Sequence, residues 1–175
     1  MRFDAATAEC LVFTRAEGLL SAFAHDLKIR VETFTLVVDD VTGAVSAELD
    51  AASLRVVGAL RGDEEAPGLL AAGDLQTIAA TMRDVLDVQR YPTIRFRSSA
   101  PPEPAAGDAG LRIAGKLDLH GTVGDVAIHA SRQGGWYVAT TTLHKPDFGI
   151  RPYSAMLGAL RVAADVGVRM AIPLS

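Results

Sequence analysis

Most of this chain alternates between apolar and polar residues with a period of two, which is typical of β-strands that bury one face. Residues 111–120 follow this pattern, with Leu111, Ile113, Leu117 and Leu119 separated by mostly polar residues. Residues 166–174 repeat it with a valine, methionine, isoleucine or leucine at every second position. Strands with one dry and one wet face are typical of antiparallel sheets, so we expect both apolar rows to face one shared interior.

The same period predicts seven further strands, at residues 9–15, 27–38, 45–49, 53–57, 93–98, 123–130 and 136–144. Within residues 27–38 the apolar positions change parity between Val31 and Phe34, so we expect a β-bulge near Glu32 and Thr33. Many short strands with few helices favour an antiparallel sheet that packs as a sandwich or closes into a barrel.

One segment has helical spacing. Its apolar residues recur every three or four positions, at Leu75, Ile78, Ala79, Met82, Val85 and Leu86. We expect an amphipathic helix over about residues 74–87, with Asp74 as the N-cap, that ends before Tyr91 and Pro92. Because its apolar residues form a single stripe, the helix should lie on a sheet surface or close an open end of the sheet.

The fold class expected is therefore mainly β: an antiparallel β-barrel of about eight strands with one amphipathic helix. A chain of 175 residues with 49% hydrophobic residues fits one domain, covering residues 1–175. Eight strands close into a narrow barrel, which can hold one small or elongated ligand when its inner side chains are of modest size. Only 6% of the residues are aromatic, so a hollow interior is expected.

Charge and hydropathy disfavour several kinds of partner. A net charge of −4 has the wrong sign for binding the phosphates of nucleic acid. The longest stretch without charge, residues 133–144, is shorter than the roughly 20 residues that span a bilayer, so no transmembrane segment is expected. No apolar segment of a secretory signal precedes Glu9, so the expected location is cytoplasmic.

Residues for chemistry are sparse. The four histidines have no metal-ligand spacing, and no known nucleophile, phosphate-binding or dinucleotide motif occurs, so we expect neither a metal nor a catalytic site. His25 and Asp26 form the one adjacent acid–base pair, but neighbouring residues of a strand point to opposite faces. Cys10 has no nearby base and is expected to be a small buried apolar residue.

Several short motifs occur together in a recognisable order. They are F-D-A-A at residues 3–6, A-H-D-L at 24–27, E-T-F at 32–34, Y-P-T-I-R-F at 91–96, G-K-L-D-L-H-G-T at 115–122 and D-F-G-I at 147–150. In this order the chain resembles the YceI-like, polyisoprenoid-binding proteins, and the resemblance covers nearly the whole chain. It implies a lipocalin-like antiparallel barrel that holds a long isoprenoid chain, often a quinone tail, in an internal tunnel.

The resemblance therefore suggests a non-enzymatic lipid-binding protein, with an isoprenoid or other long-chain amphiphile as its partner and no catalytic cofactor. The apolar faces of the predicted strands indicate which residues line the tunnel: Phe34, Ile94, Phe96, Leu117, Leu119, Val138, Val168 and Met170. His25, Arg151 and Tyr153 occupy family-like loop positions and are the candidates for contacting a polar head.

Two other classes of function stay open at this point. The first is a structural or interaction module whose barrel is filled by its own side chains. The second is a small hydrolase or isomerase that uses His25. The sequence also leaves open transient membrane contact and a homodimer.

Overall fold

The computed structural model describes residues 1–17, 25–62, 64–105, 110–155, 157 and 159–174. It contains one α-helix, α1 (Ala72–Leu86), among the described residues. The strands are β1 (Arg2–Asp4), β2 (Glu9–Thr14), β3 (Ala16–Glu17), β4 (Asp26–Val31), β5 (Phe34–Val38), β6 (Val45–Asp50), β7 (Leu54–Arg61), β8 (Glu64–Glu65), β9 (Thr93–Ser98), β10 (Glu103–Pro104), β11 (Gly110–Leu119), β12 (Thr122–Gln133), β13 (Trp136–His144), β14 (Ser154–Ala155), β15 (Leu160–Val162) and β16 (Asp165–Pro173). Two 3₁₀ turns are η2 (Ala51–Ser53) and η3 (Lys145–Phe148).

Nearly all the strands belong to one antiparallel sheet. Hydrogen-bonded neighbours follow the order β1-β5-β6-β9-β11-β12-β13-β16-β2-β4-β7-β8, and β10 pairs with β11. A second, small sheet has the order β14-β15-β3. The predicted mainly β, antiparallel fold with one helix is confirmed.

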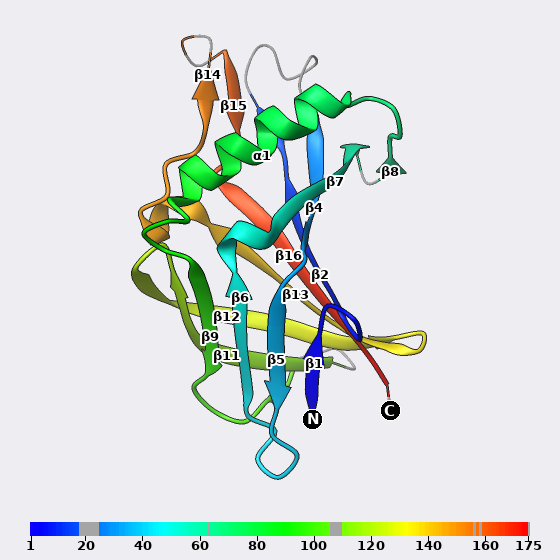
Figure 1. Ribbon diagram of the computed structural model, residues 1–175. Helices are drawn as coiled ribbons and strands as arrows, with labels where there is room; N and C mark the ends of the chain where they lie inside the picture. Colours follow the sequence, from blue (N-terminus) through cyan, green and yellow to red (C-terminus); the bar gives the residue numbers. More distant parts are fainter. Residues whose placement is uncertain (18–24, 63, 106–109, 156, 158, 175) are drawn as a thin grey trace.

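The large sheet curls around an interior (Figure 1). One long hairpin, residues 26–61, contributes a pair of strands to each half of this sheet. In one half of the hairpin β4 pairs with β7 and with β2, and in the other β5 pairs with β6 and with β1. Hydrogen bonds hold the pairing together between the halves. The Glu32 N–H donates to the Ser53 carbonyl oxygen at 3.2 Å, and the Asp50 N–H donates to that of Thr33 at 3.0 Å.

The strands are more numerous than expected, because the predicted strand 27–38 is divided into β4 and β5 and because six strands of two or three residues, β1, β3, β8, β10, β14 and β15, are not among those predicted. β4 and β5 form one bent ribbon, and β6 and β7, interrupted by η2, form another. The β-bulge expected near Glu32 and Thr33 is not found there, because one strand ends at Val31 and the next begins at Phe34. The register shift lies instead between Lys28 and Ile29, where Val57 of β7 has no partner on β4.

Helix α1 lies across one end of the curled sheet, where it contacts β7 and η2, and both chain termini lie toward the opposite end (Figure 1). It begins two residues earlier than expected, and Asp74 is not the N-cap. Asp74 is the third residue of the helix, and its Oδ2 accepts a hydrogen bond from the Ala71 N–H at 2.9 Å. The residue after the helix, Asp87, has a left-handed conformation, so the helix ends before Tyr91 and Pro92 as expected.

Two of the sequence motifs are packing features of the sheet. Gly115 faces the ring of Phe96 so closely that a Cβ atom there would lie 2.5 Å from the ring and from the Arg97 carbonyl oxygen. His120 and Gly121 both have positive φ and form the tight turn between β11 and β12. The ring of Tyr91 packs against His120, with 4.5 Å between the ring centroids. These glycines are therefore required by close approach and by turn geometry.

Replacing Gly115 with alanine tests this packing. The new methyl group would meet a core ring and a backbone oxygen, so we expect Gly115→Ala to lower the free energy of unfolding by about 1–3 kcal/mol in denaturant titration. Gly58→Ala is the matched control on a strand, because a Cβ there meets nothing within 4 Å. An equal loss in both variants would contradict the proposed packing.

Candidate ligand-binding cavity

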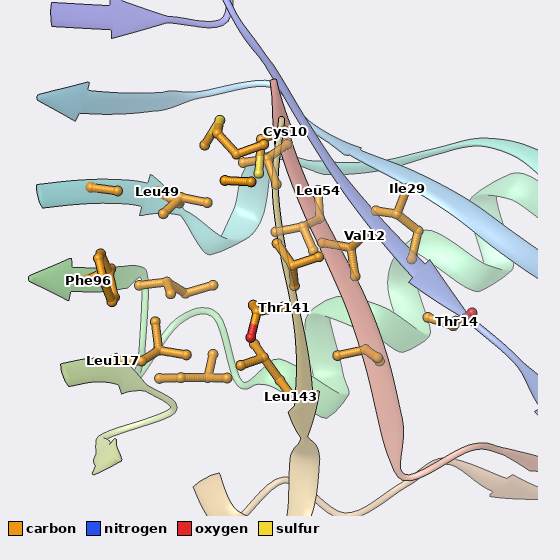
Figure 2. A pocket seen from close by; sticks show the side chains of 18 of the residues that line it. Cys10, Val12, Thr14, Ile29, Leu49, Leu54, Phe96, Leu117, Thr141 and Leu143 are labelled. Carbon is orange, nitrogen blue, oxygen red and sulfur yellow. The ribbon is translucent and has the colours of Figure 1, made fainter. Parts of the chain in front are cut away.

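The curled sheet and α1 enclose a cavity of about 960 Å³. This volume lies at the upper end of the range for small-molecule sites. Its walls come from the inward faces of β2, β4, β5, β6, β9, β11, β12, β13 and β16, and from one face of α1. Figure 2 shows side chains from several of these strands, among them Val12, Phe96, Leu117 and Leu143, pointing toward a common space. The interior is therefore hollow and lined almost entirely by apolar side chains.

The cavity is elongated along the ribbon formed by β4 and β5. Lining residues on this ribbon begin at Leu27 and end at Val38. At about 3.3 Å per residue, these positions follow about 36 Å of chain, measured along the bend between β4 and β5. A long chain suits this space better than a compact, ring-shaped ligand does.

Cys10 is a buried part of the cavity wall. Its side chain lines the cavity and is only 1% exposed, as expected for a small buried apolar residue. Burial, with a smaller contribution from the charge of Glu9, raises the pKa of the thiol to about 12. The thiol is therefore protonated at neutral pH and is not an activated nucleophile.

Polar lining residues gather at the α1 end. They include Thr14, His25, Thr77, Lys145, Tyr153 and Arg161. Tyr153 and Arg161 line the cavity while staying exposed to solvent, so the cavity is open to solvent at this end. Burial lowers the pKa of Lys145, and the charges of Glu17 and Asp165 oppose that shift.

The structure places most of the predicted binding residues on the cavity wall. The following predicted residues line it: His25, Ile94, Phe96, Leu117, Leu119, Tyr153, Val168 and Met170. They come from three strands, β9, β11 and β16, and from two connecting segments, which the curled sheet brings together. Their contact with a ligand stays a prediction.

Three predicted residues lie elsewhere. Val138 is buried, but its neighbours Tyr137 and Ala139 line the cavity, so its own side chain lies on the other face of β13. Phe34 begins β5 at the kink and packs with Cys10 and Val31 in a separate core cluster. Arg151 is exposed and does not line the cavity.

Lys145 is a lining residue that the sequence analysis missed. The correct inward parity of β13 is Tyr137, Ala139, Thr141 and Leu143, and the next position in that series is Lys145. Alternation could have found Lys145, but residues 136–144 carry small or polar residues on both faces and Val138 favoured the other parity.

The described part of the chain shows neither a cluster of metal ligands nor a membrane-spanning helix. No three histidine, cysteine, aspartate or glutamate side chains in this part of the chain lie together as metal ligands would. None of its helices is long and apolar enough to cross a membrane.

Comparison with known proteins agrees with the motifs. The model of the YceI-like domain matches residues 3–174, and the chain therefore belongs to the YceI-like family. BcnA of Burkholderia cenocepacia is similar over 98% of this chain and 99% of its own, with a TM-score of 0.65 and 16% identity. A YceI protein of Campylobacter jejuni is similar over 83% of this chain and 82% of its own, with a TM-score of 0.56 and 12% identity. At these identities the structural likeness concerns the fold alone. No curated protein matches this chain.

The raised pKa of Cys10 predicts a specific dependence of stability on pH. Above the ordinary value of 9.0 the unfolded thiol loses its proton, whereas the folded thiol keeps it up to about pH 12. The unfolded state then binds fewer protons, so this group lowers the free energy of unfolding by about 1.4 kcal/mol per pH unit in that window. Relative to Cys10→Ala, the wild-type protein should lose stability between pH 9 and pH 11 in denaturant titrations. Parallel curves for the two proteins would contradict the burial of the thiol.

Proposed function

We propose that this protein binds a long isoprenoid-like lipid, such as the tail of a quinone, and performs no chemistry on it. The observation that carries this proposal is the hollow, elongated and apolar cavity of about 960 Å³. Burying apolar ligand surface contributes about 25 cal/mol per Å², so each 100 Å² contributes about 2.5 kcal/mol. Affinity for the chain then needs no covalent bond and no cofactor. The expected cytoplasmic location stays a prediction.

The cavity also argues against a barrel that serves only as an interaction module. Such a module would fill its interior with its own side chains, because an empty apolar space forfeits packing contacts. Here the ring of Phe96 packs over Gly115, and the ring of Phe148 packs over Gly124. Each ring lies against a glycine, in space that the side chain of a larger residue would occupy. The large cavity is not filled by these rings.

An enzyme that uses His25 is supported less well. An oriented general base needs a carboxylate bonded to its ring. The neighbouring Asp26 carboxylate instead accepts a hydrogen bond from the Ala16 N–H at 2.8 Å. Among the described residues His25 has no hydrogen-bond partner, so we assign it to contact with the polar head of the ligand.

The His25 assignment predicts a small and selective loss of affinity. Removing one hydrogen bond costs about 0.5–1.5 kcal/mol, so His25→Ala should weaken binding of farnesol by at most about tenfold. Binding of farnesene, a hydrocarbon of the same chain without the hydroxyl, should not change. Displacement of a fluorescent probe measures both affinities. A turnover of any substrate that disappears in His25→Ala, with folding and lipid binding intact, would favour an enzyme instead.

A second prediction concerns the tunnel itself. Val168 of β16 lies opposite Val12 and Thr141 on neighbouring strands, and all three side chains line the cavity. An indole at this position should obstruct the tunnel, so Val168→Trp should weaken farnesol binding by at least about tenfold, equivalent to about 1.4 kcal/mol.

Val123→Trp is the matched control, because Val123 is 62% exposed and does not line the cavity. This variant should bind farnesol like the wild-type protein. Circular dichroism should confirm that both variants fold. Undiminished binding by a folded Val168→Trp protein would count against the tunnel as the binding site.

A further inference from the structure

The two ends of the cavity differ in polarity. Toward the turn between β5 and β6 the wall includes Val38, Val45 and Pro102. Met1 also lines the cavity, but its N-terminal ammonium donates to the Val38 carbonyl oxygen at 2.7 Å and to Asp40 Oδ1 at 3.0 Å. Toward α1 the wall carries Lys145, Tyr153 and Arg161. An amphiphile in this cavity therefore has one favourable orientation, with its polar head at the α1 end and its chain directed toward the opposite end.

The polar groups at the α1 end differ in what they can offer to a ligand. The hydroxyl groups of Thr77 and Thr81 donate to the carbonyl oxygens of Gly73 and Thr77, at 3.0 Å each. Within the described residues, the side chains of Lys145, Tyr153 and Arg161 make no hydrogen bond. Among the described residues this end of the cavity therefore presents three hydrogen-bond donors with no protein acceptor; two of them are cations, and Lys145 is the one that is half-buried.

Lys145 is the central residue of this group. It starts η3, is half-buried, and its ammonium makes no ion pair with any described residue. Glu17 and Asp165 act on it through their charge, but neither lines the cavity. Asp165 is itself bonded to His144, with 2.6 Å between Oδ1 and Nδ1.

The remaining charges near the opening support the same reading. Arg161 lines the cavity and lies opposite Glu17 in the pairing of β15 with β3, but Glu17 itself lies outside the lining. Asp74 does line the cavity, although one of its oxygens accepts a hydrogen bond from the Ala71 N–H. The two cations thus line the cavity, whereas Glu17, which projects from the same face of the small sheet as Arg161, and Asp165 are not among the lining residues.

We propose that the lipid carries an anionic oxygen head, a carboxylate or a phosphate ester, which binds Lys145 at the α1 end with Arg161 and Tyr153 as additional donors. This assignment rests on the proposed function, because the chain of the same ligand fills the apolar part of the cavity. A charged oxygen group can accept hydrogen bonds from all three side chains, and charge-assisted hydrogen bonds are roughly twice as strong as neutral ones.

Paired ligands that differ only in the head test the proposal. Farnesyl phosphate and farnesol share one chain, as do hexadecanoate and hexadecanol, and each is titrated below its micelle concentration. The wild-type protein should bind at least one anion about tenfold or more tightly than its alcohol, a difference of about 1.4 kcal/mol. The anion with the larger ratio distinguishes a phosphate from a carboxylate head.

Substitutions then locate the head. Lys145→Met should reduce the ratio of anion to alcohol affinity to about one, and Lys145→Arg should retain the preference for the anion. Lys116→Met is the matched control, because Lys116 pairs with Asp125 outside the cavity, 2.7 Å from Nζ to Oδ1. It should retain the full preference.

The possible failures can be told apart. Equal binding of anion and alcohol by the wild-type protein would overturn the anionic head and leave the isoprenoid-binding function standing. A preference that persists in Lys145→Met would overturn the assignment to Lys145. If none of the four ligands binds, the proposed function fails and the head assignment fails with it.

Discussion

The cavity depends on the hydrogen bonds that span the kink of the hairpin formed by residues 26–61. An uninterrupted pair of strands would continue in one direction and keep the same neighbours. Here Glu32 and Thr33 bond to Asp50 and Ser53 across the kink, so both strands can change direction without losing their pairing. β4 then meets β2, and β6 meets β9. The bent hairpin thereby connects the two halves of the sheet, and the inward faces of strands far apart in the sheet order surround one space.

The space stays open because the wall residues are small or flat against the wall. Gly115 receives the ring of Phe96, which lines the cavity, and aliphatic residues line most of the remainder. The helix contributes a stripe that includes Ile78 and Met82 to the same lining. Lys145, Tyr153 and Arg161 lie at one end, so the cavity has a part suited to a head beside a longer, mostly apolar part suited to a chain.

The sequence was sufficient to predict the strands, the helix and most of the lining, because a residue buried on one face of a strand leaves a period of two. It was insufficient where both faces of a strand carry similar residues. Along β13 the parity of Val138 was chosen, and Lys145 was missed as a consequence. Phe34 had the expected parity, but the kink beside it directs it into a core cluster. Such changes of direction depend on hydrogen bonds between residues far apart in the sequence, which a local pattern does not contain.

The central claim is that the interior holds a long apolar chain, and native mass spectrometry of the purified protein tests it most directly. We expect a species heavier than the protein alone, and extraction with organic solvent should remove the difference and release a long-chain lipid. The same protein, once extracted, should take up farnesol or a longer isoprenoid and regain an added mass. A protein that is isolated without bound lipid and takes up none of these chains when they are supplied in excess would contradict the account.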